Sequence, residues 1–276
     1  MAEKSLLITG CSSGIGYDAA HHMKEKGWRV FATCRNPEDC ARLEADGLES
    51  FVLDYNDTAS IHGALRETLN RTGGTLDAVF NNGAYGIPGA VEDMPTDALR
   101  AIFETNLFGY HELTRAVIPV MRSQGRGRIV NCSSVLGFVT LKWRGAYQAT
   151  KFALEGLTDT LRIEMADSPI HVILIEPGPI TSKIRENSAP HFEKWVDWKV
   201  SPHAALYEST LIKRLYAPAS KDQFELPARA VSEKLEQALT AYTPHPRYYV
   251  TTPTYVMGFL RRLLPTRALD WVLAKN

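Results

Sequence analysis

Strand-like and helix-like segments alternate along most of this chain, and the alternation restricts the folds that it can adopt. An apolar run at residues 6–9 precedes a helix-like segment at 14–27, and the same order then repeats. The expected strands are residues 6–9, 28–33, 50–54, 76–80, 128–132, 171–175 and 247–250, and the expected helices are residues 14–27, 37–46, 58–71, 97–122, 145–165 and 227–242. Helical connections between strands require a parallel sheet with helices on both faces. The sequence therefore predicts an α/β fold with a doubly wound sheet and right-handed crossovers.

Two later segments depart from this alternation. Residues from about 184 to 226 are rich in aromatic side chains, and residues from about 254 to 276 carry apolar side chains at helical spacing around Arg261 and Arg262. The tail is expected to pack on its own domain or on a sister subunit, and contact with a membrane surface is the less favoured alternative. No linker-like stretch separates these segments from the rest. We therefore expect one domain over residues 1–276, long enough to bury a full core.

Charge and cysteine usage argue against several classes of function. Lys plus Arg and Asp plus Glu both number 31, so the chain lacks the basic excess typical of nucleic-acid-binding proteins. The four cysteines, Cys11, Cys34, Cys40 and Cys132, form no CxxC pair, and the histidines show no metal-ligand spacing. We therefore expect free thiols in a reducing compartment, the cytoplasm, and no metal site. We also expect neither a signal peptide nor a membrane-spanning segment, since no apolar run is long enough.

A glycine-rich turn follows the first expected strand. Gly10, Gly14 and Gly16 are spaced as GxxxGxG, a variant of the GxGxxG dinucleotide-binding pattern. Glycine lets the backbone approach a phosphate, and the helix that follows offers unpaired N–H groups and the positive end of its dipole. The alternative is a strand-to-helix turn that merely needs glycine. The predicted cofactor contacts in this turn are Gly10, Ser12, Ser13, Gly14, Ile15 and Gly16.

The choice of cofactor is expected to depend on the end of the second strand. Arg35 lies there, and no acid occurs before Glu38. An acid would bond the ribose 2′-OH of NAD, whereas the planar guanidinium of Arg matches the 2′-phosphate of NADP. The sequence thus favours NADP(H). NAD(H) is the alternative, with Arg35 stacked on adenine or left in solvent. Asp54, which ends the third strand, is predicted to reach the adenine. Asn81 ends the fourth strand and Gly83 follows it, and the backbone there is predicted to line the adenine ribose.

Tyr147 and Lys151 are four residues apart in an expected helix, which places a phenol and an ammonium on one face. A phenol has a pKa near about 10, and a neighbouring ammonium lowers that pKa toward neutral pH. Such a pair can give a proton to a carbonyl oxygen while hydride reaches the carbon. The pair alone is more typical of an ordinary helix surface, but the glycine-rich turn earlier in the chain favours catalysis.

Together these motifs resemble the classical short-chain dehydrogenase/reductase family, and within it the retinol and steroid dehydrogenases and bacterial aldehyde reductases. The matching stretches are 9–16 (TGxxxGIG), 81–84, Asn106, Ser134, 147–151 (YxxxK) and 177–178 (Pro-Gly), in the order of the family. The resemblance implies one doubly wound Rossmann-like domain with a mostly or wholly parallel seven-stranded sheet. One departure is Gly83-Ala84, where the family usually has Ala-Gly. Both residues are small, so we expect the same backbone path.

The resemblance also implies a catalytic set of Asn106, Ser134, Tyr147 and Lys151. Tyr147 would be the general acid/base, and Ser134 would hold the carbonyl oxygen. Lys151 would lower the pKa of Tyr147 and bond the nicotinamide ribose, to which Tyr147 lies close. Asn106 would sit at a helix irregularity and hold a water. Ser133 is the less favoured serine because side chains alternate along a strand.

A second implied contact is the loop beside the nicotinamide. Pro177 and Gly178 would line it, and a following hydroxyl would meet the carboxamide. Thr181 and Ser182 both qualify, and the sequence does not choose between them, although Thr181 is the favoured cofactor contact.

The chain is thus predicted to be an NADP(H)-dependent oxidoreductase that interconverts an alcohol and an aldehyde or ketone. Residues 184–226 match the family's substrate loop, and their aromatic side chains favour a bulky apolar substrate, or else form the core of a lid. The alternatives are a non-catalytic NADP-binding sensor, an NAD-linked alcohol dehydrogenase, and an isomerase or lyase on the same fold. The resemblance further implies a homodimer or homotetramer.

Overall fold

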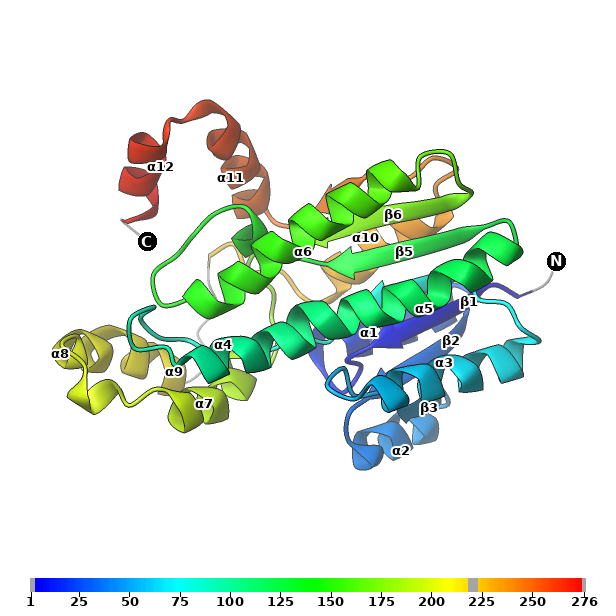
Figure 1. Cartoon of the computed structure of the whole chain (residues 1–276), viewed down its shortest axis with the longest axis horizontal. Coiled ribbons are helices and arrows are strands. Elements are labelled where there is room, and N and C mark those ends of the chain that lie inside the picture. The colour runs from blue at the N-terminus through cyan, green and yellow to red at the C-terminus, as the bar shows by residue number, and fades with distance from the viewer. Residues whose placement is uncertain (1–2, 218–222, 275–276) are drawn as a thin grey trace.

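The computed structural model describes residues 3–217 and 223–274 and contains one sheet of seven parallel strands in that part of the chain (Figure 1). The strands are β1 (Ser5–Thr9), β2 (Arg29–Cys34), β3 (Glu49–Val52), β4 (Ala78–Asn81), β5 (Gly127–Cys132), β6 (Ile170–Glu176) and β7 (Arg247–Tyr249). Their order is β3-β2-β1-β4-β5-β6-β7. The order reverses between β1 and β4, so the doubly wound, wholly parallel sheet that the sequence predicted is confirmed.

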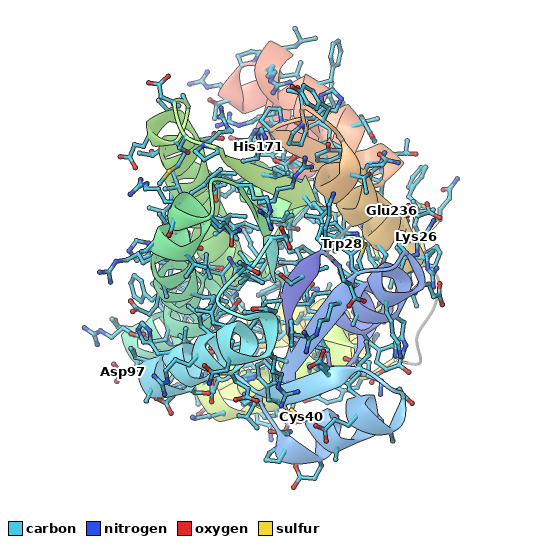
Figure 2. All side chains as sticks on the ribbon, turned by 90° about the vertical axis from the view of Figure 1, so that its right-hand side faces the viewer. Lys26, Trp28, Cys40, Asp97, His171 and Glu236 are labelled. Carbon is cyan, nitrogen blue, oxygen red and sulfur yellow. The ribbon has the colours of Figure 1, made fainter. Side chains whose placement is uncertain are left out.

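Helices cover both faces of this sheet because alternate strand residues point to opposite sides. Leu6 and Ile8 of β1 pack with α1 (Gly14–Glu25), α2 (Pro37–Ala45) and α10 (Arg229–Thr240). Leu7, between them, packs with α3 (Thr58–Thr72), α5 (Gly109–Ser123) and α6 (Gly145–Glu164). On the first face α1 and α10 are further joined through Glu236. Its carboxylate forms an ion pair with Lys26 at 3.1 Å (Figure 2) and a hydrogen bond with His22 at 2.7 Å.

The helix expected over 97–122 is not regular. It consists of α4 (Thr96–Phe103), a π-helical segment (Glu104–Phe108) and α5. Asn106 lies in the π-helical segment and is fully buried. Asn is a weak helix former because its amide competes for backbone groups, and here that amide bonds the backbone of Tyr85. The periodicity of apolar residues carried no sign of the extra residue in this turn.

Residues 184–216 form a helical lid over one end of the sheet. It contains α7 (Ile184–Trp195), α8 (Ala204–Leu206), a π-helical segment (Tyr207–Ile212) and α9 (Lys213–Tyr216). Phe192 and Tyr207 are buried, so these two aromatics form the core of the lid, as one of the two alternatives predicted. Figure 1 shows the lid at the end of the molecule that is opposite the N-terminus.

The tail is helical, as its apolar spacing predicted, and forms two helices. They are α11 (Thr252–Leu263) and α12 (Thr266–Leu273). Pro265 breaks the run because its ring disfavours helical geometry in the preceding residue. Met257, Leu260, Leu264, Leu269 and Leu273 pack on the segment 135–141, so the tail packs on its own domain. Tyr255, Val256, Phe259 and Leu263 remain exposed. Within the described residues, none of the helices is long and apolar enough to cross a membrane.

Candidate active site

The glycine-rich turn connects β1 to α1 and is packed against the turn that follows β4. Gly10 has φ +70°, a left-handed conformation that favours glycine. A side chain on Gly10 would lie 2.9 Å from the nitrogen of Gly83 and closer still to its Cα. Asn82 clamps the two turns, since its Nδ2 donates to the carbonyls of Thr9 at 3.0 Å and Gly10 at 3.3 Å. Although this chain has Gly83-Ala84 where the family usually has Ala-Gly, a small residue, Gly83, still lies at the contact between the two turns.

The N-terminus of α1 is partly open to solvent, which leaves it accessible to a phosphate. Ser12, Ser13, Gly14 and Ile15 are half-exposed, and the Ser13 side chain does not cap the helix. A Cβ on Gly16 would lie 2.7 Å from Asn82 Nδ2 and closer still to the Gly10 carbonyl oxygen. The turn is thus a tight cradle that any larger residue would fill. Such a cradle, with backbone N–H groups at a helix start, fits a dinucleotide pyrophosphate.

Arg35 lies directly after β2 and is exposed. Among the described residues its guanidinium has no hydrogen-bond or ion-pair partner, which leaves it available to a ligand phosphate. Two neighbours of Arg35, Tyr85 and His191, were not predicted from the sequence. The charge of Arg35 acts to lower the pKa of both side chains, and their rings stack with centroids 4.0 Å apart. Since His191 lies on α7, this stack joins the lid to the loop that follows β4.

Asp54 lies outside the third strand, and the Asn81 side chain is buried. β3 ends at Val52, so Asp54 belongs to the following turn, where its Oδ1 accepts from Asn56 N at 2.9 Å. Asn81 ends β4 and is fully buried. Its amide accepts from Tyr55 at 2.8 Å and donates to Asn131 at 2.8 Å, so the side chain is committed to a buried network. A contact of the adenine ribose with the backbone at Asn81 and Gly83 stays a prediction.

Helix α6 brings Tyr147 and Lys151 to the carboxyl end of β5. Lys151 is 1% exposed, and its Nζ donates to the Cys132 carbonyl at 2.7 Å. The same Nζ lies 5.6 Å from the centroid of the Tyr147 ring. Ser134 follows β5 by two residues and interacts with the Tyr147 hydroxyl. The structure therefore brings these three predicted residues together at one end of one strand.

The protonation state of Tyr147 differs from the expectation. Burial raises the pKa of its phenol, whereas the Ser134 hydroxyl and the charge of Arg144 oppose that rise. Burial also lowers the pKa of Lys151 to about 8, opposed by the charges of Cys132 and Glu155. The expectation that Lys151 would lower the Tyr147 pKa below its usual value is thus wrong for the chain alone, because desolvation penalises both charged forms. At neutral pH Tyr147 holds its proton and Lys151 is cationic.

Asn106 hydrogen-bonds directly to α6, the helix that carries Tyr147. Its Nδ2 donates to Tyr85 O at 2.9 Å and to Thr150 Oγ1 at 3.2 Å, and its Oδ1 accepts from Tyr85 N at 3.1 Å. Thr150 in turn donates to the Tyr147 carbonyl at 2.7 Å. The Asn106 side chain therefore joins the loop after β4 to the helix that carries Tyr147. Its water-holding role stays a prediction.

The loop after β6 lies beside the turn of Ser134. The Pro177 carbonyl accepts from Val135 N at 2.8 Å. A side chain on Gly178 would lie 2.8 Å from Thr254 Oγ1, so the tail packs directly behind this loop. Ser182 contacts the glycine-rich turn, since its Cβ would lie 3.2 Å from a side chain on Gly14. Thr181 is exposed, and its N–H donates to Leu226 O at 2.9 Å.

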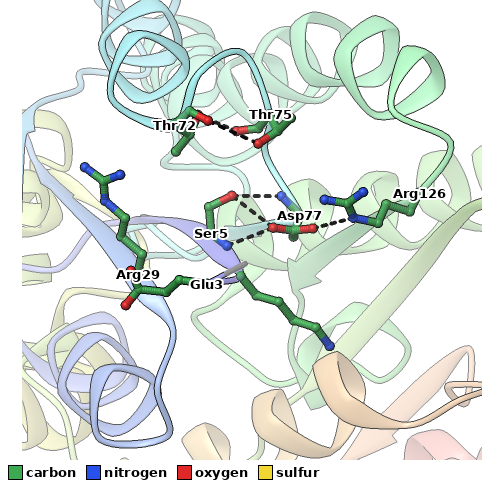
Figure 3. Close-up of a pocket in the computed structure, with 8 residues that line it drawn as sticks. Glu3, Ser5, Arg29, Thr72, Thr75, Asp77 and Arg126 are labelled. Carbon is green, nitrogen blue, oxygen red and sulfur yellow. Dashed lines mark hydrogen bonds and ion pairs between the residues drawn. The ribbon is translucent and has the colours of Figure 1, made fainter. Parts of the chain in front are cut away.

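A separate cavity of about 380 Å³ lies at the amino ends of the strands, away from these residues (Figure 3). Three of its charged side chains, Asp77, Arg126 and Arg29, are already paired. Asp77 bonds Arg126 at 2.7 Å and the backbone of Ser5 at 2.9 Å, and Arg29 bonds Glu49 at 2.6 Å. No predicted site residue lines it, so this cavity is not the candidate active site.

Comparison with known proteins agrees with this arrangement. The profile of the short chain dehydrogenase family matches residues 4–192. The uncharacterized oxidoreductase YbbO of Escherichia coli K12 is 36% identical over 271 residues, which cover 98% of this chain and 94% of that protein. Human retinol dehydrogenase 8 is 32% identical over 230 residues, covering 81% and 72%. A solved short-chain dehydrogenase from Streptomyces avermitilis has a TM-score of 0.77 at 27% identity, covering 100% of this chain and 97% of that one.

The fold, the order of the motifs and the similar proteins all indicate the same family. The parallel sheet places a glycine cradle for a nicotinamide dinucleotide beside the end of β5, where Ser134, Tyr147 and Lys151 meet. The family profile covers well over half of the chain, and the match to YbbO covers nearly all of it. The chain therefore belongs to the short-chain dehydrogenase/reductase family, the nicotinamide-dependent oxidoreductases that act on alcohol and carbonyl groups.

Proposed function

We propose that this protein is an NADP(H)-dependent carbonyl reductase with Tyr147 as its general acid. The observation that carries the proposal is the meeting of Ser134, Tyr147 and Lys151 at the end of β5. The nicotinamide supplies the hydride when it is bound. The Ser134 hydroxyl holds the substrate oxygen by a hydrogen bond. Tyr147, protonated at neutral pH because burial raises its pKa, gives its proton to that oxygen as negative charge develops there.

Lys151 supports this step as a buried cation. Its ammonium lies under the Tyr147 ring and stabilises the phenolate that proton transfer leaves behind. The proposed cofactor contacts along the cleft are Gly10, Ser12, Ser13, Gly14, Ile15, Gly16, Arg35, Asp54, Pro177, Gly178 and Thr181, together with Tyr147 and Lys151 at the nicotinamide. Ser182 joins them because it contacts Gly14.

The function is tested by following NADPH, and separately NADH, in the presence of a panel of aldehydes and ketones. Consumption of NADPH with one class of carbonyl compound supports the proposal and begins to identify the substrate. Preferential use of NADH with alcohols would favour the NAD-linked dehydrogenase instead. Tight NADPH binding, by fluorescence, with no turnover of any panel compound would favour the sensor.

Arg35→Ala is expected to raise the KM for NADPH by about tenfold or more while changing the KM for NADH little. The reason is that only NADPH carries the 2′-phosphate that the exposed, unpaired guanidinium would bind. Steady-state kinetics with both cofactors measure the effect, and Arg35→Lys should recover part of it. Equal changes for both cofactors would contradict the assignment of NADP.

The rate of carbonyl reduction should fall as the pH rises through about 8, the pKa of Lys151. Below that pH the ammonium is charged and stabilises the developing phenolate, and above it the amine is neutral. Tyr147 does not titrate in this range because its pKa is raised. A profile of kcat/KM against pH measures this, and no fall between about pH 7 and about pH 9 would contradict the role of Lys151.

We also propose that the protein is a homodimer or homotetramer in the cytoplasm. Phe152, Leu157 and Ile163 of α6 are exposed, as is Phe108 at the start of α5, so the outer layer of these two helices offers an apolar surface to a second copy. The four cysteines are buried and unpaired, which suits a reducing compartment. Sedimentation or light scattering would measure the assembly.

A further inference from the structure

Three arginines without a partner lie near one another, and one of them, Arg144, also lies near Tyr147. Arg144 immediately precedes α6, three residues before Tyr147, while Arg185 lies on α7 and Arg214 on α9. None of them has a side-chain hydrogen bond or an ion pair within the residues that the structure describes. Some arginines elsewhere are paired, for example Arg29 with Glu49 and Arg126 with Asp77, whereas Arg35 and Arg66 are unpaired but exposed. Arg144 differs from those two because it is half-buried and lies near two further positive charges, with no carboxylate of the described residues bonded to it.

Arg144 is the most constrained of the three. It is half-buried, and its neighbours Trp143 and Tyr147 pack with Phe192, Tyr207 and other apolar residues of the lid. Burial and the charges of Arg214 and Arg185 lower its pKa to about 10. Taking a guanidinium out of water without an anion is costly. A bound anion would remove that cost.

The backbone that presents Arg144 is held firmly. Trp143 has φ +67°, the one positive φ of a non-glycine residue in the described chain. Its carbonyl accepts from Gly89 N at 3.0 Å, and its ring lies 4.5 Å from that of Tyr207. The Tyr207 hydroxyl donates to Asp93 at 2.9 Å. Strain of this kind persists only where the surroundings over-determine it, and it concentrates at functional sites.

We propose that the carbonyl substrate carries a carboxylate, which Arg144, Arg185 and Arg214 bind while the carbonyl lies at Tyr147. The apolar residues of the lid would contact the chain between the two groups. This inference rests on the proposed reductase function and narrows its substrate class from an apolar carbonyl compound to an oxo acid. Guanidinium groups suit the role because they bind carboxylates with paired hydrogen bonds.

The competing anion is a phosphate of the cofactor. Arg185 is only three residues from Ser182, which contacts the glycine-rich turn. The two possibilities predict different kinetic effects when an arginine is replaced. If they bind the substrate, the loss of an arginine changes the preference among substrates. If they bind the cofactor, it changes the KM for NADPH with every substrate.

The test compares a homologous series of ω-oxo carboxylic acids with their methyl esters, which have the same chain and carbonyl but no charge. The wild-type enzyme should reduce the best acid with a kcat/KM about tenfold or more above that of its ester. Arg144→Gln should abolish this preference, chiefly through the KM for the acid, and Arg144→Lys should restore part of it. The matched control is Arg66→Gln on α3, an exposed arginine without a partner in the described chain, which should keep the preference.

Arg214→Gln, at an exposed position on α9, provides a second variant if Arg144→Gln fails to bind NADPH. It should weaken the preference without altering the fold. The proposal is overturned if the wild-type enzyme does not favour acids, if both variants keep the preference, or if they raise the KM for NADPH equally with acids and esters. If the wild-type enzyme reduced neither the acids, nor the esters, nor any other carbonyl compound of the panel, the proposed reductase function itself would be refuted.

Discussion

Tyr147→Phe is expected to lower kcat for carbonyl reduction by a factor of about 10² to 10⁴, the range for loss of a general acid. The change removes one oxygen atom, the one that would protonate the substrate. The ring itself packs in the cluster beneath the lid and is kept. We therefore expect unchanged binding of NADPH and little change in stability. The measurement is kcat with NADPH and a reducible carbonyl compound, with cofactor binding followed by fluorescence.

Tyr110→Phe is the matched control for this variant. Tyr110 is 1% exposed, and its hydroxyl has no hydrogen-bond partner in the structure. It too lies near Lys151, whose Nζ is 5.3 Å from the centroid of its ring. Removing an unsatisfied buried hydroxyl is close to neutral or stabilising. Turnover should survive in Tyr110→Phe and disappear in Tyr147→Phe, and a Tyr147→Phe enzyme that keeps most of its turnover would refute the proposed acid.

Gly16→Ala is expected to disrupt the cofactor cradle. The added Cβ would lie 2.7 Å from Asn82 Nδ2 and closer still to the Gly10 carbonyl oxygen. Neither group can move freely, because Asn82 clamps the turn and Gly10 abuts Gly83. We expect the Kd for NADPH to rise by about tenfold or more and the free energy of unfolding to fall by about 2–3 kcal/mol. Fluorescence titration and thermal unfolding measure the two effects.

Gly156→Ala controls for the addition of a methyl group to a helical glycine. Gly156 is exposed on α6, and a Cβ there would have no atom within 4 Å. This substitution should raise the free energy of unfolding by about 0.5–1 kcal/mol through the better helix propensity of Ala. If Gly16→Ala behaved like Gly156→Ala in both stability and NADPH binding, the turn would not be the tight cradle described above.

Local patterns were sufficient to predict the sheet because its inner strands are short apolar runs buried on both faces, whereas each helix buries one apolar face. The alternation of such runs with helix-like segments identified all seven strands and their parallel arrangement. Local patterns predicted the element ends less well. The third strand ends at Val52 and not at residue 54. The π-helical segment of Asn106, within the helix expected over 97–122, was implied by the family resemblance and not by the apolar periodicity. Such details depend on partners distant in sequence, here the backbone of Tyr85 and the hydroxyl of Thr150.

Some features of the candidate site could likewise be predicted from the sequence, and others could not. The sequence by itself determined the doubly wound fold, the glycine-rich turn and the spacing of Tyr147 and Lys151, since these depend on short-range pattern and residue type. Only the tertiary structure showed that Asn81 is buried in a hydrogen-bonded network and that burial governs the pKa of Tyr147. Only it brought Arg144, Arg185 and Arg214 to one place. Burial and charge proximity arise from long-range packing, which no local pattern of residues encodes.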